Sequence, residues 1–237
     1  MKDKLVSILK CLGLFILFFT ISAIPISVFN IDIEKFSELE IVLYSFGCNI
    51  VFLIVIMACY FKTLKKDFKP FFKDFLNNFE EAFKYYIIGL GIMVVSNLII
   101  TFVFSGGIGD NETTVRSYID ISPFIMFLEV AIYAPIAEEL LFRKSLREVF
   151  KNKWLYIFIS GFIFGALHVV GAENLNLFDL LYLIPYCSLG FTFSYIYAKT
   201  DNIYSTISIH AMHNAVTIIL YLTGASLWLK KYLKFYQ

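Results

Sequence analysis

The segment CLGLFILFFTISAIPISVF, residues 11–29, contains no charged side chain, and Lys2, Lys4 and Lys10 precede it. A secretory signal peptide has an apolar region of only about 7 to 15 residues, whereas a helix of about 20 apolar residues crosses a bilayer. The segment is too long for the first and suits the second. We therefore expect it to stay attached to the chain as a first transmembrane helix.

Similar apolar runs recur along the chain. Of its 237 residues, 59% are hydrophobic and 16% are charged, whereas an average soluble domain is about 45 to 50% apolar and 25% charged. Because backbone groups inside a bilayer must be hydrogen-bonded within their own segment, such runs form helices. The expected fold class is all-α, a polytopic transmembrane helix bundle of about seven to eight spans. The runs lie near residues 5–29, 41–61, 85–104, 123–142, 154–170, 180–198 and 203–223.

The connecting segments differ in charge and predict an orientation. Residues 62–84 and 143–153 are rich in basic side chains, whereas residues 31–40, 109–120 and 171–179 lean acidic. Loops rich in Lys and Arg stay in the cytoplasm, so we expect a multi-pass plasma-membrane protein with a cytoplasmic N-terminus. The net charge of +1 offers no basic footprint for nucleic acid.

Two basic segments allow more than one interpretation. Residues 62–84 repeat Phe and Lys at helical spacing, so they form either an amphipathic helix on the membrane surface or an ordinary loop that anchors two spans. The basic C-terminal tail would lie outside the cell after seven spans, against the charge rule. Either residues 225–237 form an additional interfacial helix, or one of the spans is misjudged.

Three short motifs put polar side chains inside the apolar runs: EELLFR (138–143), FGALH (164–168) and HAMHN (210–214). A charged residue at a helix centre resists membrane insertion by about 2.5 to 3.5 kcal/mol, and such residues usually face the bundle interior and mark function. With turns expected near residues 152 and 201, a rise of about 1.5 Å per residue places the motifs at overlapping depths. All three can therefore contribute to one site.

Helical rotation separates the roles within the motifs. Arg143 follows Glu139 by four residues and shares its face, so we expect these two to pair, while Glu138 faces a cavity. His210 and Asn214 share a face in the same way, whereas His213 points elsewhere and is expected to be a bystander.

The surroundings of the motifs suggest further features. Gly161 and Gly165 form a small-xxx-small face that would bring His168 against a neighbouring helix. Pro135 removes a backbone hydrogen bond just before the glutamates and can open the helix there. Glu129 is expected near the outer interface, away from the site.

The motifs EExxxR, FxxxH and HxxxN, in this order on successive apolar segments, resemble the CAAX protease and bacteriocin-processing family of intramembrane proteases, also called the Abi or CPBP family. The resemblance covers about residues 123–224. It implies a CAAX prenyl protease-like core at residues 123–224, preceded by N-terminal transmembrane helices and linkers at 1–122 and followed by an interfacial tail at 225–237, in one membrane domain. It also implies a peptide or protein substrate within the lipid bilayer.

The expected activity is hydrolysis of a peptide bond by an activated water. Glu138 would act as general base and His168 would hold the water or shuttle its proton. His210 and Asn214 would donate hydrogen bonds to the oxyanion. Glu139 and Arg143 would give structural support.

A catalytic zinc ion is an open alternative, although no cofactor is certain. Glu138, His168 and His210 could supply three protein ligands and leave a fourth position for water. The HExxH spacing of many zinc peptidases is absent from the sequence. A second alternative, from a different functional class, is a non-catalytic membrane protein that confers bacteriocin self-immunity or regulates a membrane partner.

Overall fold

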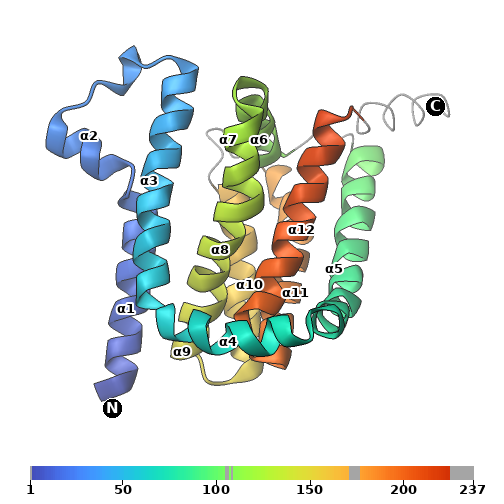
Figure 1. Ribbon diagram of the computed structural model, residues 1–237. Coiled ribbons are helices and arrows are strands. Elements are labelled where there is room, and N and C mark those ends of the chain that lie inside the picture. Colours follow the sequence, from blue (N-terminus) through green and yellow to red (C-terminus); the bar gives the residue numbers. More distant parts are fainter. Residues whose placement is uncertain (1, 105–106, 108, 171–176, 225–237) are drawn as a thin grey trace.

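The computed structural model describes residues 2–104, 107, 109–170 and 177–224, and within these ranges the regular structure is helical (Figure 1). The predicted all-α membrane bundle is confirmed. The helices are α1 (Lys2–Thr20), α2 (Ala23–Phe29), α3 (Glu38–Cys59), α4 (Phe61–Lys73), α5 (Phe75–Val103), α6 (Asp110–Ile121), α7 (Pro123–Leu128), α8 (Ala134–Glu138), α9 (Leu146–Val149), α10 (Lys153–Val170), α11 (Leu183–Thr200) and α12 (Ile203–Leu222). Short 3₁₀ segments lie at Ile33–Lys35 and Asp179–Tyr182, and π-helical segments at Glu129–Tyr133 and Glu139–Ser145.

The predicted number of membrane spans is too high. Among the described residues, 5 helices are long and apolar enough to cross a membrane, or up to 6 if α1 and α2 count as one broken span. The five are α3, α5, α10, α12 and α11 with the 3₁₀ turn that precedes it. The additional interfacial helix lies outside the described residues, and the cytoplasmic N-terminus stays a prediction.

The first expected span is broken where proline forbids a continuous helix. Helices α1 and α2 meet at a bend of 65°. Pro25 lies in α2, and a proline inside a helix clashes with the carbonyl of the residue four positions earlier, which is here Ile21, at the break. The expectation of one continuous helix near residues 5–29 is therefore wrong, because the ring of Pro25 ends α1 before α2 begins.

The run near residues 123–142 is not one regular helix either. It alternates between α7, a π-helical segment at Glu129–Tyr133, α8, and a second π-helical segment at Glu139–Ser145. The irregular stretch thus brackets Pro135 and contains both glutamates of the first motif. Irregular backbone at membrane depth is tolerated where protein covers it or where it lines a cavity, and π-bulges are frequent at functional sites.

Helices α10 and α11 pack closely through glycine, as the small-residue spacing predicts. A Cβ atom at Gly161 would lie 2.7 Å from the backbone nitrogen of Phe191, and one at Gly165 would lie 2.7 Å from that of Cys187. One turn beyond Gly165, the ring of His168 stacks on Tyr186 of α11, with 5.0 Å between ring centroids. The glycines therefore set the spacing that brings His168 against its neighbouring helix.

Helix α4 runs across one end of the bundle (Figure 1) and fixes the start of α12. The buried side chain of Asp67 accepts a hydrogen bond from the backbone N–H of Ile203 at 3.1 Å, and Asn202 Nδ2 donates to the Asp67 carbonyl at 2.9 Å. A carboxylate at a helix N-terminus satisfies an unpaired N–H and interacts well with the helix dipole. Residues 62–73 belong to α4 and residues 75–84 to α5, so the segment is helical rather than a loop, and its place on a membrane surface stays a prediction.

Candidate active site

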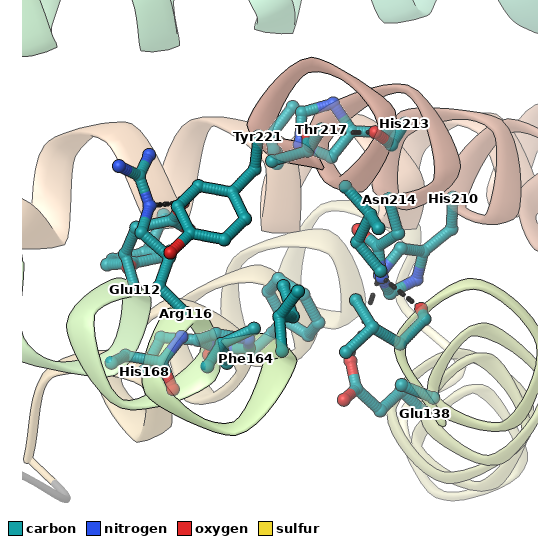
Figure 2. Close-up of a pocket in the computed structure, with 18 of the residues that line it drawn as sticks. Glu112, Arg116, Glu138, Phe164, His168, His210, His213, Asn214, Thr217 and Tyr221 are labelled. Carbon is teal, nitrogen blue, oxygen red and sulfur yellow. Dashed lines mark hydrogen bonds and ion pairs between the residues drawn. The ribbon is translucent and has the colours of Figure 1, made fainter. Parts of the chain in front are cut away.

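The three motifs meet around one cavity of about 210 Å³ (Figure 2). Glu138 comes from α8, His168 from α10, and His210 and Asn214 from α12. All four predicted catalytic residues line this cavity, although Glu138 and Asn214 are 76 positions apart in the sequence. The sequence predicts that these side chains lie at overlapping depths in the membrane, and in the structure they line one cavity.

Glu139 and Arg143 form the predicted pair behind the cavity. Arg143 Nε lies 3.0 Å from Glu139 Oε2, and both side chains are fully buried. The guanidinium carbon lies 4.4 Å from the ring centroid of Phe164 and 5.5 Å from that of Phe193. The opposite charge of Glu139 and the faces of two aromatic rings thus compensate a cation held away from water.

Glu139 has a second partner, which the sequence does not reveal. Its Oε1 atom accepts a hydrogen bond of 2.8 Å from Nδ1 of His210. A carboxylate can only accept, so Nδ1 carries the proton and the tautomer of His210 is fixed. The i, i+4 spacing accounts for one oxygen of Glu139 only, and the other oxygen orients a histidine on a different helix.

Glu138 faces the other nitrogen of the same histidine. Its Oε2 atom lies 3.9 Å from His210 Nε2. This oxygen is buried and has no hydrogen-bond partner among the described residues, which is costly for a carboxylate in a protein interior. A water about 2.8 Å from both atoms would satisfy the geometry of two hydrogen bonds. The pair can therefore hold a small polar molecule between a carboxylate and an imidazole.

His168 stands across the cavity from this pair. Its Nδ1 atom bonds to the Phe164 carbonyl at 2.7 Å, so Nδ1 donates and Nε2 of the neutral ring is left as an acceptor. The ring centroid of Phe164 lies 4.5 Å from that of His168 and 5.8 Å from that of His210. Figure 2 draws Phe164 between His168 and Glu138. His168 thus contributes to the cavity wall without direct contact to Glu138.

Asn214 is held by the irregular backbone before Pro135. In this π-helical turn the N–H of Ala134 bonds to the Glu129 carbonyl instead of that of Val130. The next N–H that could reach the Val130 carbonyl belongs to position 135, and proline has none. Asn214 Nδ2 donates to this carbonyl at 2.8 Å. One amide N–H of Asn214 is thereby used, and its second N–H remains for a ligand.

One neighbouring residue, His213, differs from its expected position. His213, the expected bystander, also lines the cavity, and its Nδ1 is hydrogen-bonded to the hydroxyl of Tyr86 at 2.9 Å. Glu129 is not among the described residues that line the cavity, and its place near the outer interface stays a prediction; it accepts a hydrogen bond of 2.5 Å from Asn49 of α3, and its other oxygen is buried. Helical rotation could not predict either contact, because the partners come from other helices.

The ligands of the alternative zinc site do not fit a metal as they are placed. In the described part of the chain, no three His, Cys, Asp or Glu side chains are grouped so that they could hold an ion. The bond of His210 Nδ1 to Glu139 would leave Nε2 free for an ion, but Phe164 lies between His168 and the Glu138–His210 pair. The three side chains therefore do not converge on one point as they are placed.

Known proteins resemble the part of the chain that carries the motifs. A family model described as type II CAAX prenyl endopeptidase Rce1-like matches residues 120–216. A Bacillus subtilis protein named "Putative membrane peptidase YdiL" is 32% identical over 121 residues, which are 49% of this chain and 46% of that protein. The chain thus spans about half the length of this relative. No solved structure matches the chain significantly.

Two proteins of Lactococcus lactis extend the comparison. The UPF0177 protein YaiH is 32% identical over 102 residues, 42% of this chain and 40% of that protein. The UPF0177 protein YvdC is 24% identical over 198 residues, 79% of this chain and 68% of that protein. These matches confirm the resemblance that the motifs predict: residues 120–216 are similar to the Rce1-like CAAX prenyl endopeptidases.

Proposed function

We propose that this protein is an intramembrane endopeptidase that hydrolyses a peptide bond of a membrane-associated peptide or protein with a water activated by Glu138. The observation that carries the proposal is the buried, unpartnered Oε2 of Glu138, 3.9 Å from His210 Nε2. The relationship of residues 120–216 to the Rce1-like family and the name of the Bacillus relative support a peptidase.

In the proposed reaction, Glu138 takes a proton from the water while the water oxygen adds to the carbonyl carbon of the substrate. The second N–H of Asn214 donates to the oxyanion. The intermediate then collapses, the C–N bond breaks, and Glu138 returns the proton to the leaving nitrogen. A carboxylic acid and an amine are released, and Glu138 regains its starting state.

His210 can take part in this scheme as a neutral or as a protonated ring, and His168 has a separate role. With Nδ1–H bonded to Glu139, Nε2 of neutral His210 accepts a hydrogen bond from the water and helps to orient it. The oxyanion role predicted for His210 requires the protonated ring, in which Nε2–H donates. His168, with Nε2 open to the cavity, fits the proton shuttle that the sequence predicts.

Substituting Glu138 by Gln tests the proposal. A pool of fluorescence-quenched apolar peptides is first screened with the wild-type protein in lipid nanodiscs. A peptide that the wild-type protein cleaves then serves as the substrate for all variants. Because a general base contributes about 10² to 10⁴ in rate, Glu138→Gln is expected to lower kcat by at least a hundredfold. Glu148→Gln is the matched control, because Glu148 pairs with Lys10 and Lys144 outside the cavity.

Thermal stability separates the enzyme from the alternative of a non-catalytic immunity or regulatory protein. An unpartnered buried oxygen destabilises the fold, so Glu138→Gln is expected to leave the unfolding midpoint unchanged or to raise it while cleavage is lost. A polar network that only holds helices together would lose stability on this change. Unaltered cleavage by Glu138→Gln would refute the proposed function.

A further inference from the structure

A second cavity of about 320 Å³ adjoins the one that contains Glu138. It lies between α5, α6, α11 and α12, and α5 contributes Met93, Asn97 and Thr101. A water occupies about 30 Å³ in the liquid, so this space holds roughly ten waters or several side-chain groups. The two cavities share the lining residues Glu112, Arg116, Tyr186, Leu189, His213 and Thr217.

The shared wall carries a single strong cation. Arg116 is the only lysine or arginine among the described residues that line either cavity. In Figure 2, Arg116, Glu112 and Tyr221 lie on the opposite side of the pocket from Glu138. A group bound to Arg116 is therefore separated from the proposed reacting atoms by the width of the cavity.

Arg116 is held in place through one nitrogen and one face of its guanidinium. Nε donates to Glu112 Oε1 at 2.8 Å. The guanidinium carbon lies 5.0 Å from the ring centroid of Tyr221, and the Tyr221 hydroxyl donates to Asp120 Oδ1 at 2.8 Å. The terminal amino groups of arginine carry four further N–H donors, and no described residue accepts a hydrogen bond from them.

This arrangement suits a carboxylate. The two terminal nitrogens of a guanidinium match the two oxygens of a carboxylate in a bidentate pair. The pair with Glu112 is partly exposed, with 24% and 30% of the two side chains accessible, and a pair of this kind is worth only about 0.3 to 0.5 kcal/mol. Glu112 therefore orients Arg116 without saturating it.

We propose that Arg116 is a specificity-determining residue that binds a carboxylate of the substrate, from a peptide C-terminus or from an Asp or Glu side chain, where the two cavities join. The identity of the ligand as a substrate rests on the proposed peptidase function. The binding itself does not require cleavage, so the two can be tested separately.

The test is a binding measurement on the full chain with the Glu138→Gln background, which prevents cleavage during the measurement. The probes are three fluorescein-labelled Leu/Ala peptides in lipid nanodiscs: one with a free C-terminal carboxylate, one with a C-terminal amide, and one amide with an Asp near its end. Fluorescence anisotropy gives Kd for each. Hydrogen bonds to charged groups are individually strong, so at least one carboxylate peptide is expected to bind tenfold or more tightly than the neutral amide.

Three further substitutions assign this preference to Arg116. Arg116→Gln is expected to abolish it, and Arg116→Lys to retain part of it, because lysine keeps the charge and loses the bidentate geometry. Lys84→Gln is the matched control: Lys84 makes the same kind of i, i+4 pair, with Glu80 at 2.9 Å, outside both cavities, and its loss should leave the preference intact.

The outcomes decide between the possibilities. A gain for the free terminus alone assigns the site to a peptide C-terminus, and a gain for the Asp peptide assigns it to a side chain. Equal binding of acids and amide, no binding of any probe, or a preference that survives Arg116→Gln overturns the proposal. An equal loss for all three peptides in Arg116→Gln also overturns it, because Arg116 would then only support the fold. Failure of the peptidase function appears separately, as equal cleavage by wild type and Glu138→Gln.

Discussion

Replacing Arg143 by Met is expected to cause a large loss of stability that a second substitution restores. Arg143 and Glu139 are both fully buried and 3.0 Å apart. Methionine resembles the arginine stem in length and is apolar, so Arg143→Met removes the charge with little change in packing against Phe164 and Phe193. The carboxylate of Glu139 is then left without its cation, and only His210 bonds to it.

The magnitude follows from the burial of the pair. Breaking a buried ion pair by removing one partner costs about 3 to 5 kcal/mol, whereas replacing both partners by neutral groups is often close to neutral. Glu139→Gln alone leaves Arg143 charged and unpaired, so it should cost a similar amount. In the double variant no charge remains, and the amide oxygen that Glu139→Gln introduces can still accept from His210 Nδ1. A coupling free energy of at least about 2 kcal/mol is expected.

The assay is a double-mutant cycle on the purified protein in lipid nanodiscs, with the free energy of unfolding measured for wild type, both single variants and the double variant. Helix–helix interactions in membranes are often weaker than burial suggests, because unfolded helices find other partners in the bilayer. A cost below about 1 kcal/mol for each single variant, or additive costs in the double variant, would refute a tightly coupled buried pair.

Three further predictions address packing, pH and metal. Gly161→Ala should lower the unfolding midpoint by the equivalent of about 1 to 3 kcal/mol, because the new Cβ would lie 2.7 Å from the Phe191 backbone nitrogen. Gly91→Ala is the control, since a Cβ there meets nothing within 4 Å. Equal midpoints for the two variants would contradict this packing. Burial raises the pKa of Asp67 above its ordinary value of 3.8. The folded state then binds more protons than the unfolded state between pH 3.8 and the raised pKa, so the free energy of unfolding should fall as pH rises through this window, and Asp67→Asn should remove that fall; parallel pH profiles would disprove the assignment. Exhaustive chelation should leave peptide cleavage unchanged, and a loss that zinc restores would contradict a site without metal.

Local rules predict those features that depend on one helix. The i, i+4 spacing of Glu139 and Arg143 and the spacing of Gly161, Gly165 and His168 along α10 each correspond to a contact in the structure. Depth along the helices suggests that the three motifs share a slab of the membrane, and the residues of all three line one cavity. Their catalytic roles stay predictions.

Contacts between helices are beyond such rules, since they depend on rotation and tilt that no local spacing encodes. The bond between His210 and Glu139 joins residues 71 positions apart, and the bond of Asn214 to the Val130 carbonyl needs a π-helical turn that hydropathy does not signal. The break at Ile21 could have been predicted from Pro25, which lies four residues later and clashes with the Ile21 carbonyl in a continuous helix. Hydropathy alone does not detect it, because proline barely changes the average over an apolar run. Arg116 lies outside the motifs, and only the cavity identifies it.

The central claim is that water, activated by Glu138, attacks the peptide bond. Its most direct test is a single-turnover cleavage in H₂¹⁸O with excess unlabelled enzyme, followed by mass spectrometry of the product that carries the new carboxylate. If water attacks directly, the first turnover places one ¹⁸O atom in that carboxylate. An unlabelled carboxylate in the first turnover would mean that an oxygen of the enzyme attacked the substrate, and would contradict the assignment of Glu138 as general base.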